Sequence, residues 1–256
     1  MRKAVAVVMS CLLFMSSSQF VVAKESNQNS KKTQKEIHES IQRDMDDYYK
    51  KYADKLMTFE EYVNLNESNN NEKEVENIKE LDEADILRSS GPKHERGTND
   101  ISYADFKNGD IILVHDGFCY YGYWRHGAIF DEEVGSFISA QRKDSGNGEG
   151  VIYEPKSWYR NKYDKAKGLK TKVTGGNIES KKSDMIVWLR QFVGKCKYSF
   201  LSPKNLDDND TWYCTLLPWK GYKKFFDLDI DADKGPMCSP DDISNSNNVE
   251  VFVEAD

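Results

Sequence analysis

The stretch from residue 109 to residue 153 decides the fold, because four short apolar runs follow one another there. The runs read GDIILV (109–114), HGAIF (126–130), SFISAQ (136–141) and GVIY (150–153). Closely spaced short strands with turn residues between them are typical of an antiparallel sheet. The sequence therefore predicts such a sheet in this region.

Downstream of this stretch the pattern becomes mainly helical. We expect a short helix (156–163), a further strand (169–173), two longer helices (178–193 and 212–226) and a closing strand (249–253). Gly194 ends the first longer helix, and Pro218 inside the second implies a kink or a late start. The fold class is therefore α+β, an antiparallel sheet packed with helices that follow most of its strands.

Upstream of the sheet, residues 24–90 form an acidic arm with helical patterns, which carries 11 basic and 17 acidic side chains. An apolar stripe at helical spacing marks its first helix and consists of Ile37, Ile41, Met45, Tyr48, Tyr52 and Leu56. A second helix begins at Thr58, which has capping-box spacing to Glu61. Residues 72–88 are again helix-compatible. The chain thus divides into this arm and a domain of residues 91–256.

The apolar stripe cannot stay exposed without a cost in free energy, so we expect the arm to pack against the domain of residues 91–256. The acidic surface of the arm, and its position ahead of the domain, also allow an inhibitory, propeptide-like role. The alternative is a flexible tether, which the Asn-rich break at residues 68–71 favours.

The first 23 residues have the pattern of a cleaved secretory signal peptide. Arg2 and Lys3 precede an apolar run (4–15), and the short side chains before Lys24 suit cleavage after Ala23. The alternatives are an amphipathic first helix and a lipoprotein that would use Cys11. We therefore expect a secreted protein, either extracellular or associated with the cell wall.

The composition excludes several classes of function. A formal net charge of −7 and a pI of about 5.3 argue against a nucleic-acid-binding protein. No apolar run approaches the roughly 20 residues that a membrane-spanning helix needs. The sequence contains no CxxC or CxxH spacing, so we expect no metal site, and no organic cofactor is implied.

The chain offers few candidates for nucleophilic catalysis. Four cysteines remain after the signal peptide, and they could form two disulfides or leave one reactive thiol. Cys214 stands where a predicted helix begins, and the positive end of a helix lowers a thiol pKa while its free N–H groups can bind an oxyanion. His126 opens a strand directly after the aromatic loop of residues 120–124. On the residues alone, such a cysteine is more often a small buried residue, and His115 competes with His126 on equal terms.

Five motifs occur in a characteristic order, namely GDIIL (109–113), WRHGAI (124–129), GKCKY (194–198), WYCTLLPW (212–219) and DLD (227–229). With these motifs, roughly residues 100–245 resemble the circularly permuted branch of the NlpC-type papain-like hydrolases, the YiiX/YycO-like proteins. In that branch the histidine strand precedes the cysteine helix. The resemblance implies a permuted papain-like fold, and it does not cover the arm.

Position by position, the resemblance implies that Cys214 is the nucleophile and His126 the base, and it gives His115 no role. The third polar residue of the family lies on the strand after the histidine, often as a glutamate. Ser139 aligns best with it, and Gln141 lies on the same face of the strand. Neither carries a charge, so we expect them to fix the imidazole tautomer but to stabilise the imidazolium less.

These observations predict a secreted cysteine hydrolase that cleaves an amide or ester bond through a thioester intermediate. The resemblance implies a peptide or acylated substrate, of the cell-wall peptide or acyl-lipid class. Two alternatives stay open. One is a non-catalytic secreted binding module on the same fold, which the uncharged third position and the uncovered acidic arm favour. The other is a lipid acyltransferase.

Overall fold

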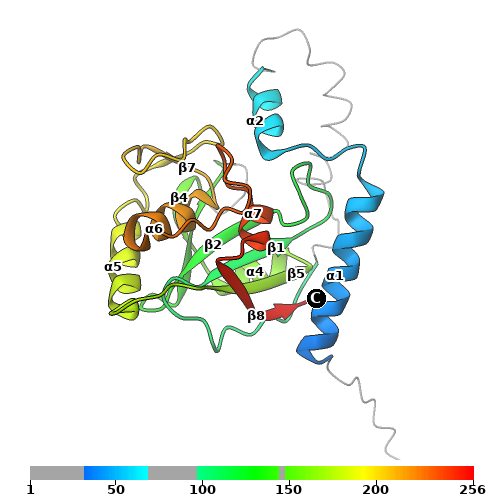
Figure 1. The fold of residues 1–256 in the computed structure, drawn as a ribbon, viewed down its shortest axis with the longest axis horizontal. Helices are drawn as coiled ribbons and strands as arrows, with labels where there is room; N and C mark the ends of the chain where they lie inside the picture. Colours follow the sequence, from blue (N-terminus) through cyan, green and yellow to red (C-terminus); the bar gives the residue numbers. More distant parts are fainter. Residues whose placement is uncertain (1–31, 69–96, 144–147) are drawn as a thin grey trace, which may run out of the picture. The chain divides into compact units, whose positions relative to one another are not determined.

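The computed structural model of the chain describes residues 32–68, 97–143 and 148–256 (Figure 1). Its main sheet has six strands in the order β4-β3-β2-β1-β5-β8, and every neighbouring pair is antiparallel. The strands are β1 (Ile111–His115), β2 (His126–Asp131), β3 (Ser136–Gln141), β4 (Gly150–Glu154), β5 (Lys165–Thr171) and β8 (Val249–Ala255). The structure confirms an α+β fold with an antiparallel sheet.

Both faces of the sheet are covered, which explains why its strands are continuous apolar runs. Along β1, Ile111 and Leu113 belong to one hydrophobic core, whereas Ile112 and Val114 belong to the other. The first core also contains side chains of the helices α5 (Ile178–Arg190) and α6 (Leu216–Phe226). The second core contains Tyr159 of the short helix α4 (Lys156–Lys162).

Helix α6 begins at Leu216, so the predicted helix of residues 212–226 is wrong in its first four residues. Thr211–Trp212 is instead the short strand β7, which pairs in parallel with β6 (Lys197–Tyr198). Pro218 falls in the first turn of α6, where its missing N–H has no helical acceptor to lose. The proline therefore causes a late start rather than a kink.

Other elements differ from the prediction mainly at their ends. Strand β5 begins at Lys165, before the expected range of residues 169–173, and helix α5 ends at Arg190. Helix α7 (Pro240–Asn245) was not expected, and a capping box between Ser239 and Asp242 marks its start.

The arm contains helix α1 (Gln34–Lys51) and helix α2 (Phe59–Ser68). The apolar stripe of α1 is buried through Ile37, Ile41, Met45 and Tyr48. The hydroxyl of Tyr48 accepts a hydrogen bond from the Cys119 N–H (2.9 Å) and donates one to the Gly122 carbonyl (2.9 Å). The structure confirms that α1 packs against the domain, as the stripe predicts.

Helix α1 also protects the open edge of the sheet, because β8 is an edge strand. The side chain of Gln34 accepts a hydrogen bond from the Glu254 N–H (2.9 Å) and donates one to its carbonyl oxygen (3.1 Å). His38 Nδ1 lies 2.7 Å from the carboxylate of the same residue. The side chain of Gln34 thus satisfies backbone groups of Glu254 that an uncovered edge strand would offer to another chain.

Several predictions fall outside the described residues, namely the signal peptide (1–23), the start of the arm (24–31) and the helix of residues 72–88. In the ranges that the structure describes, no helix combines the length and the apolar character needed to cross a bilayer.

Candidate active site

His126, the first residue of β2, has a buried side chain whose Nε2 atom meets three polar groups. It lies 3.1 Å from Ser139 Oγ, 3.0 Å from Gln141 Nε2 and 3.0 Å from Glu154 Oε2. The structure therefore brings both predicted partners, Ser139 and Gln141, to the predicted histidine. It adds a third partner, Glu154, that carries the charge these two lack.

Glu154 is fully buried at the end of β4 and has a complete set of donors for a carboxylate. Gln141 Nε2 donates to Oε1 at 2.6 Å, and the Tyr159 hydroxyl donates to Oε2. Burial alone would raise the pKa of this carboxyl, but His126 and these hydrogen bonds lower it below its usual range. Glu154 is therefore an ionised partner for the imidazole.

Two tyrosine rings lie beside the imidazole ring of His126. The rings of Tyr159 and Tyr163 lie nearly parallel to it, with centroids 6.2 Å and 6.3 Å away. Ser139 Oγ donates to the Gly127 carbonyl at 3.0 Å, so toward His126 it acts as an acceptor. Both Ser139 and Glu154 thus favour a proton on Nε2.

Cys214 lies just before α6, since Thr215 is the N-cap of that helix. Its thiol interacts with the imidazole of His126 and with the backbone N–H of Gly127. Burial would raise the pKa of the thiol, but the interactions with His126, Gly127 and Thr215 lower it below its usual range. The thiolate is the form that these neighbours stabilise.

The pKa of His126 shifts in the complementary direction. Burial by itself would lower it, but the Glu154 carboxylate and the hydrogen bonds with Cys214 and Glu154 raise it to about 10. A thiol with a lowered pKa beside an imidazole with a raised pKa favours a thiolate–imidazolium pair. Such a pair is the activated form of a cysteine nucleophile.

The close approach of α6 to β2 depends on Gly127. A Cβ atom at this position would lie 2.8 Å from Leu113 Cδ2 and 3.1 Å from Thr215 Cγ2. The hydroxyl of Thr215 donates to the Cys238 carbonyl at 2.5 Å, which fixes the N-cap from its other side. A larger residue than glycine would therefore push the cysteine away from the histidine.

The remaining candidates lie outside this cluster. His115 Nδ1 contacts Asp164 Oδ1 at 2.6 Å, and its ring stacks on Tyr123 with a centroid distance of 4.1 Å. Both contacts give it a structural role. The four cysteines that the structure describes, Cys119, Cys196, Cys214 and Cys238, all carry free thiols. Neither of the two disulfides that their number allowed is formed.

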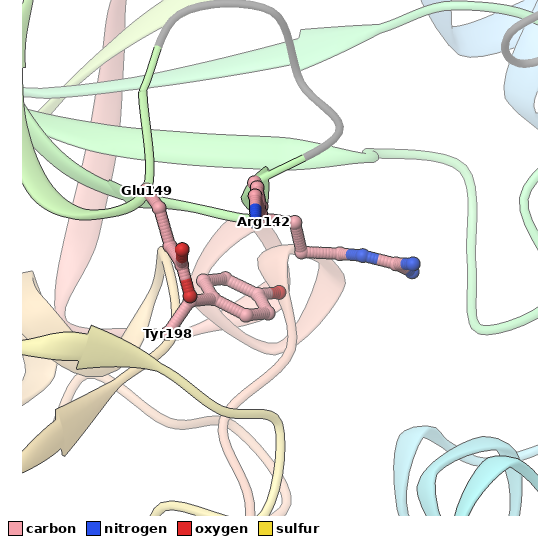
Figure 2. A pocket seen from close by; sticks show the side chains of 4 residues that line it. Arg142, Glu149 and Tyr198 are labelled. Carbon is pink, nitrogen blue, oxygen red and sulfur yellow. The ribbon is translucent and has the colours of Figure 1, made fainter.

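A cavity of about 450 Å³ opens beside the β3–β4 hairpin and is lined by Arg142, Lys143, Glu149 and Tyr198. Figure 2 shows the side chain of Arg142 extending away from Glu149 and Tyr198. Arg142 directly follows Gln141, and Tyr198 interacts electrostatically with Cys214. The cavity therefore lies at the end of β3 that carries Gln141.

The grouping best suited to a metal ion is a set of three carboxylates, those of Asp231, Asp233 and Asp242, with oxygens within 4.8 Å of one another. Lys204 already occupies this cluster, since its Nζ donates to Asp231 and to the Gly235 carbonyl (2.8 Å). The ammonium group of Lys204 thus pairs with Asp231, one of the three carboxylates.

No protein-family model matches the chain, and no curated protein matches it in sequence. Among solved structures, the chain is similar to the crystal structure of the metalloprotein yiiX from Escherichia coli O157:H7, DUF1105. The two are 15% identical with a TM-score of 0.43, over 57% of this chain and 96% of that one. A similarity this distant assigns no function to the chain.

Proposed function

We propose that the chain is a cysteine hydrolase that cleaves an amide or ester bond through a thioester intermediate. One observation carries the proposal. The thiol of Cys214 interacts with the imidazole of His126, and His126 is held at 3.0 Å by the buried carboxylate of Glu154. A nucleophile, a base and an orienting acid in this order form the general arrangement for acyl transfer.

The proposed reaction begins with the ion pair. The thiolate of Cys214 attacks the substrate carbonyl carbon and forms a C–S bond. The imidazolium of His126 gives its proton to the leaving nitrogen or oxygen as the bond to the carbonyl carbon breaks. Water then adds to the thioester while His126 takes its proton, and loss of the carboxylic acid product returns the thiolate.

The imidazole nitrogens divide these tasks. Because Nε2 faces Glu154 and Ser139, we infer that Nδ1 is the nitrogen that serves Cys214. Gln141 acts mainly on Glu154, to which its amide donates at 2.6 Å. In this proposal Glu154 stabilises the imidazolium, Ser139 accepts a hydrogen bond from its Nε2–H, and Gln141 positions the glutamate.

The start of α6 supplies the oxyanion site in this proposal. The first N–H groups of a helix lack helical acceptors, and the helix dipole makes this end positive. The backbone N–H of Cys214 would donate to the developing oxyanion, as expected for a nucleophile at a helix start.

The proposal also includes the fold of the chain, its secretion and its substrate class. The chain order, with the histidine strand before the cysteine helix, supports a permuted papain-like fold of the NlpC type. The pattern of residues 1–23 supports secretion. The substrate would be a cell-wall peptide or an acylated lipid, the classes that the family resemblance implies.

The binding-module alternative had two arguments, the uncharged third position and the acidic arm outside the resemblance. Glu154 removes the first of them. A lipid acyltransferase would use the same thioester but pass the acyl group to an alcohol or amine instead of water. Product analysis with and without such acceptors separates these two reactions.

The test is mass spectrometry of the intact chain after incubation with a panel of electrophilic amide and ester probes. We expect an adduct on Cys214 and no adduct in Cys214→Ala. The buried thiols of Cys119 and Cys238 are internal controls, because burial raises the pKa of both. Labelling of these thiols at the same rate as Cys214, or equal substrate turnover by Cys214→Ala, would contradict the proposal.

A further inference from the structure

Helix α2 of the arm packs its apolar face onto aromatic side chains of the domain. The ring of Phe59 lies 4.7 Å from that of Tyr121 and 5.6 Å from that of Tyr213, measured between centroids. The ring of Tyr62 lies 5.0 Å from Tyr121 and 5.8 Å from Phe200. The side chain of Phe59 is buried in these contacts.

These aromatic side chains adjoin residues of the cysteine–histidine cluster in the chain or by contact. Tyr213 precedes Cys214, and the Tyr121 hydroxyl donates at 3.2 Å to the carbonyl of Arg125, the residue before His126. Phe200 contacts Tyr198 with a ring-centroid distance of 5.0 Å. Only 5% of Cys214 is exposed, so a substrate of any size needs one of these walls to move.

Helix α2 is the wall most suited to movement, because α1 and α2 are held in different ways. Helix α1 is fixed by hydrogen bonds to the backbone of the domain through Tyr48 and Gln34. Helix α2 starts with its own capping box, between Thr58 and Glu61. Just before it the Met57 N–H donates to the Tyr120 carbonyl at 3.0 Å, and within the helix the rings of Phe59 and Tyr62 contact the domain. Ring contacts can be replaced by those of another apolar group.

We propose that Phe59 and Tyr62 occupy an aromatic subsite beside Cys214, formed by Tyr121, Tyr198, Phe200 and Tyr213, that binds an apolar aromatic or acyl group of the substrate. The inference rests on the proposed function, because it assigns a substrate class to that same site. Helix α2 then competes with the substrate for the subsite and lowers activity until it is displaced. Aromatic side chains favour such a ligand because ring contacts add to the burial of apolar surface.

The test compares the alkylation rates of Cys214 by a small reagent, iodoacetamide, and a bulky apolar one, N-benzylmaleimide. In the double variant Phe59→Ala/Tyr62→Ala, we expect the bulky reagent to react roughly tenfold faster or more, because ring contacts hold α2 in place. The iodoacetamide rate should change much less. Glu60→Ala, on the exposed side of the same helix, is the matched control and should leave both rates unchanged.

The ratio of the two rates decides the question. An unchanged ratio in a folded double variant overturns the proposal, as does an equal increase for both reagents. If the double variant does not fold, Tyr62→Ala alone applies the same criterion at a half-buried ring. Absence of any reaction at Cys214 with either reagent in the wild-type chain would instead contradict the proposed function.

A substrate series extends the test to turnover. Among esters that the wild-type chain hydrolyses, kcat/KM in the double variant should rise for phenylacetyl and long acyl esters relative to the acetyl ester. A uniform change over the series would mean that α2 does not occupy a substrate subsite.

Discussion

The Nε2 atom of His126 lies 3.0 Å from Oε2 of Glu154, and both side chains are buried. A carboxylate at this distance raises the pKa of an imidazole, and the pKa of His126 is raised to about 10. The protonated imidazole is the form that stabilises a thiolate on Cys214. Glu154, a residue of β4, thus affects the reactivity of Cys214, which lies before α6.

Substitution of Glu154 by Gln should lower kcat/KM by roughly two to four orders of magnitude, the scale of a lost acid–base partner. It should also move the alkaline limit of activity to lower pH, because the pKa of His126 falls once the charge is removed. The measurement is the pH dependence of kcat/KM on the best ester of the probe panel. Glu250→Gln, at an exposed position of β8, is the control. Equal profiles for the two variants would contradict the role of Glu154.

The two histidines of the sheet should differ sharply. His126→Ala should lower kcat/KM by roughly two to four orders of magnitude, because the thiol loses its base. His115→Ala removes a contact with Asp164 and a ring stack, so it should affect stability more than turnover. Steady-state kinetics and thermal unfolding of both variants check this. Similar kinetic losses, or losses in the opposite order, would overturn the assignment.

Gly127→Ala should damage the site through packing alone. The added methyl group would meet Leu113 and Thr215, so we expect a loss of about 1–3 kcal/mol in unfolding free energy, as for other overpacked positions. Activity should fall further than stability, because Thr215 adjoins Cys214. The control is Gly176→Ala, where an added Cβ has no atom within 4 Å. A Gly127→Ala variant with normal stability and activity would show that α6 can adjust without cost.

Tyr48→Phe tests the attachment of α1. The change leaves the Cys119 N–H and the Gly122 carbonyl without their partner, so the unfolding free energy should fall by about 1–3 kcal/mol. Urea denaturation measures the loss. The comparison is Tyr52→Phe, whose hydroxyl makes no hydrogen bond that the described residues show. Equal effects of the two substitutions would argue against this attachment.

The strands around the site could be predicted from the sequence because each is a compact apolar run between turn residues. The family resemblance selected His126 over His115 and aligned Ser139 with the third polar position, and the face of the strand then added Gln141. Glu154 was missed because the apolar run of β4 ends at Tyr153, and the sequence does not fix how β4 pairs with β3. In the structure Phe137 pairs with Glu154 and Gln141 with Gly150. That register places 150, 152 and 154 on the face of 137, 139 and 141.

The late start of α6 had a visible signal in Pro218, but the sequence alone left a kink as the other outcome. The two-residue strands β6 and β7 are too short to produce a periodic pattern. The contact of α2 with the site depends on tertiary packing between Phe59 and Tyr121, which sequence spacing cannot reveal. A glutamate directly after an apolar run, as at Glu154, is nevertheless a visible feature of the sequence that could have indicated this partner of His126.

The most direct test of the account is the pH dependence of Cys214 alkylation by iodoacetamide, followed residue by residue with mass spectrometry. Because the folded chain lowers the pKa of this thiol, its rate should reach half of its maximum well below pH 8.5, the approximate value for a free cysteine. The midpoint should return to about 8.5 in the urea-unfolded chain and should rise in His126→Ala. Burial raises the pKa of Cys119 to about 11, so that thiol should stay unreactive over the same range. A midpoint for Cys214 at or above that of the unfolded chain would contradict the thiolate–imidazolium pair and with it the proposed function.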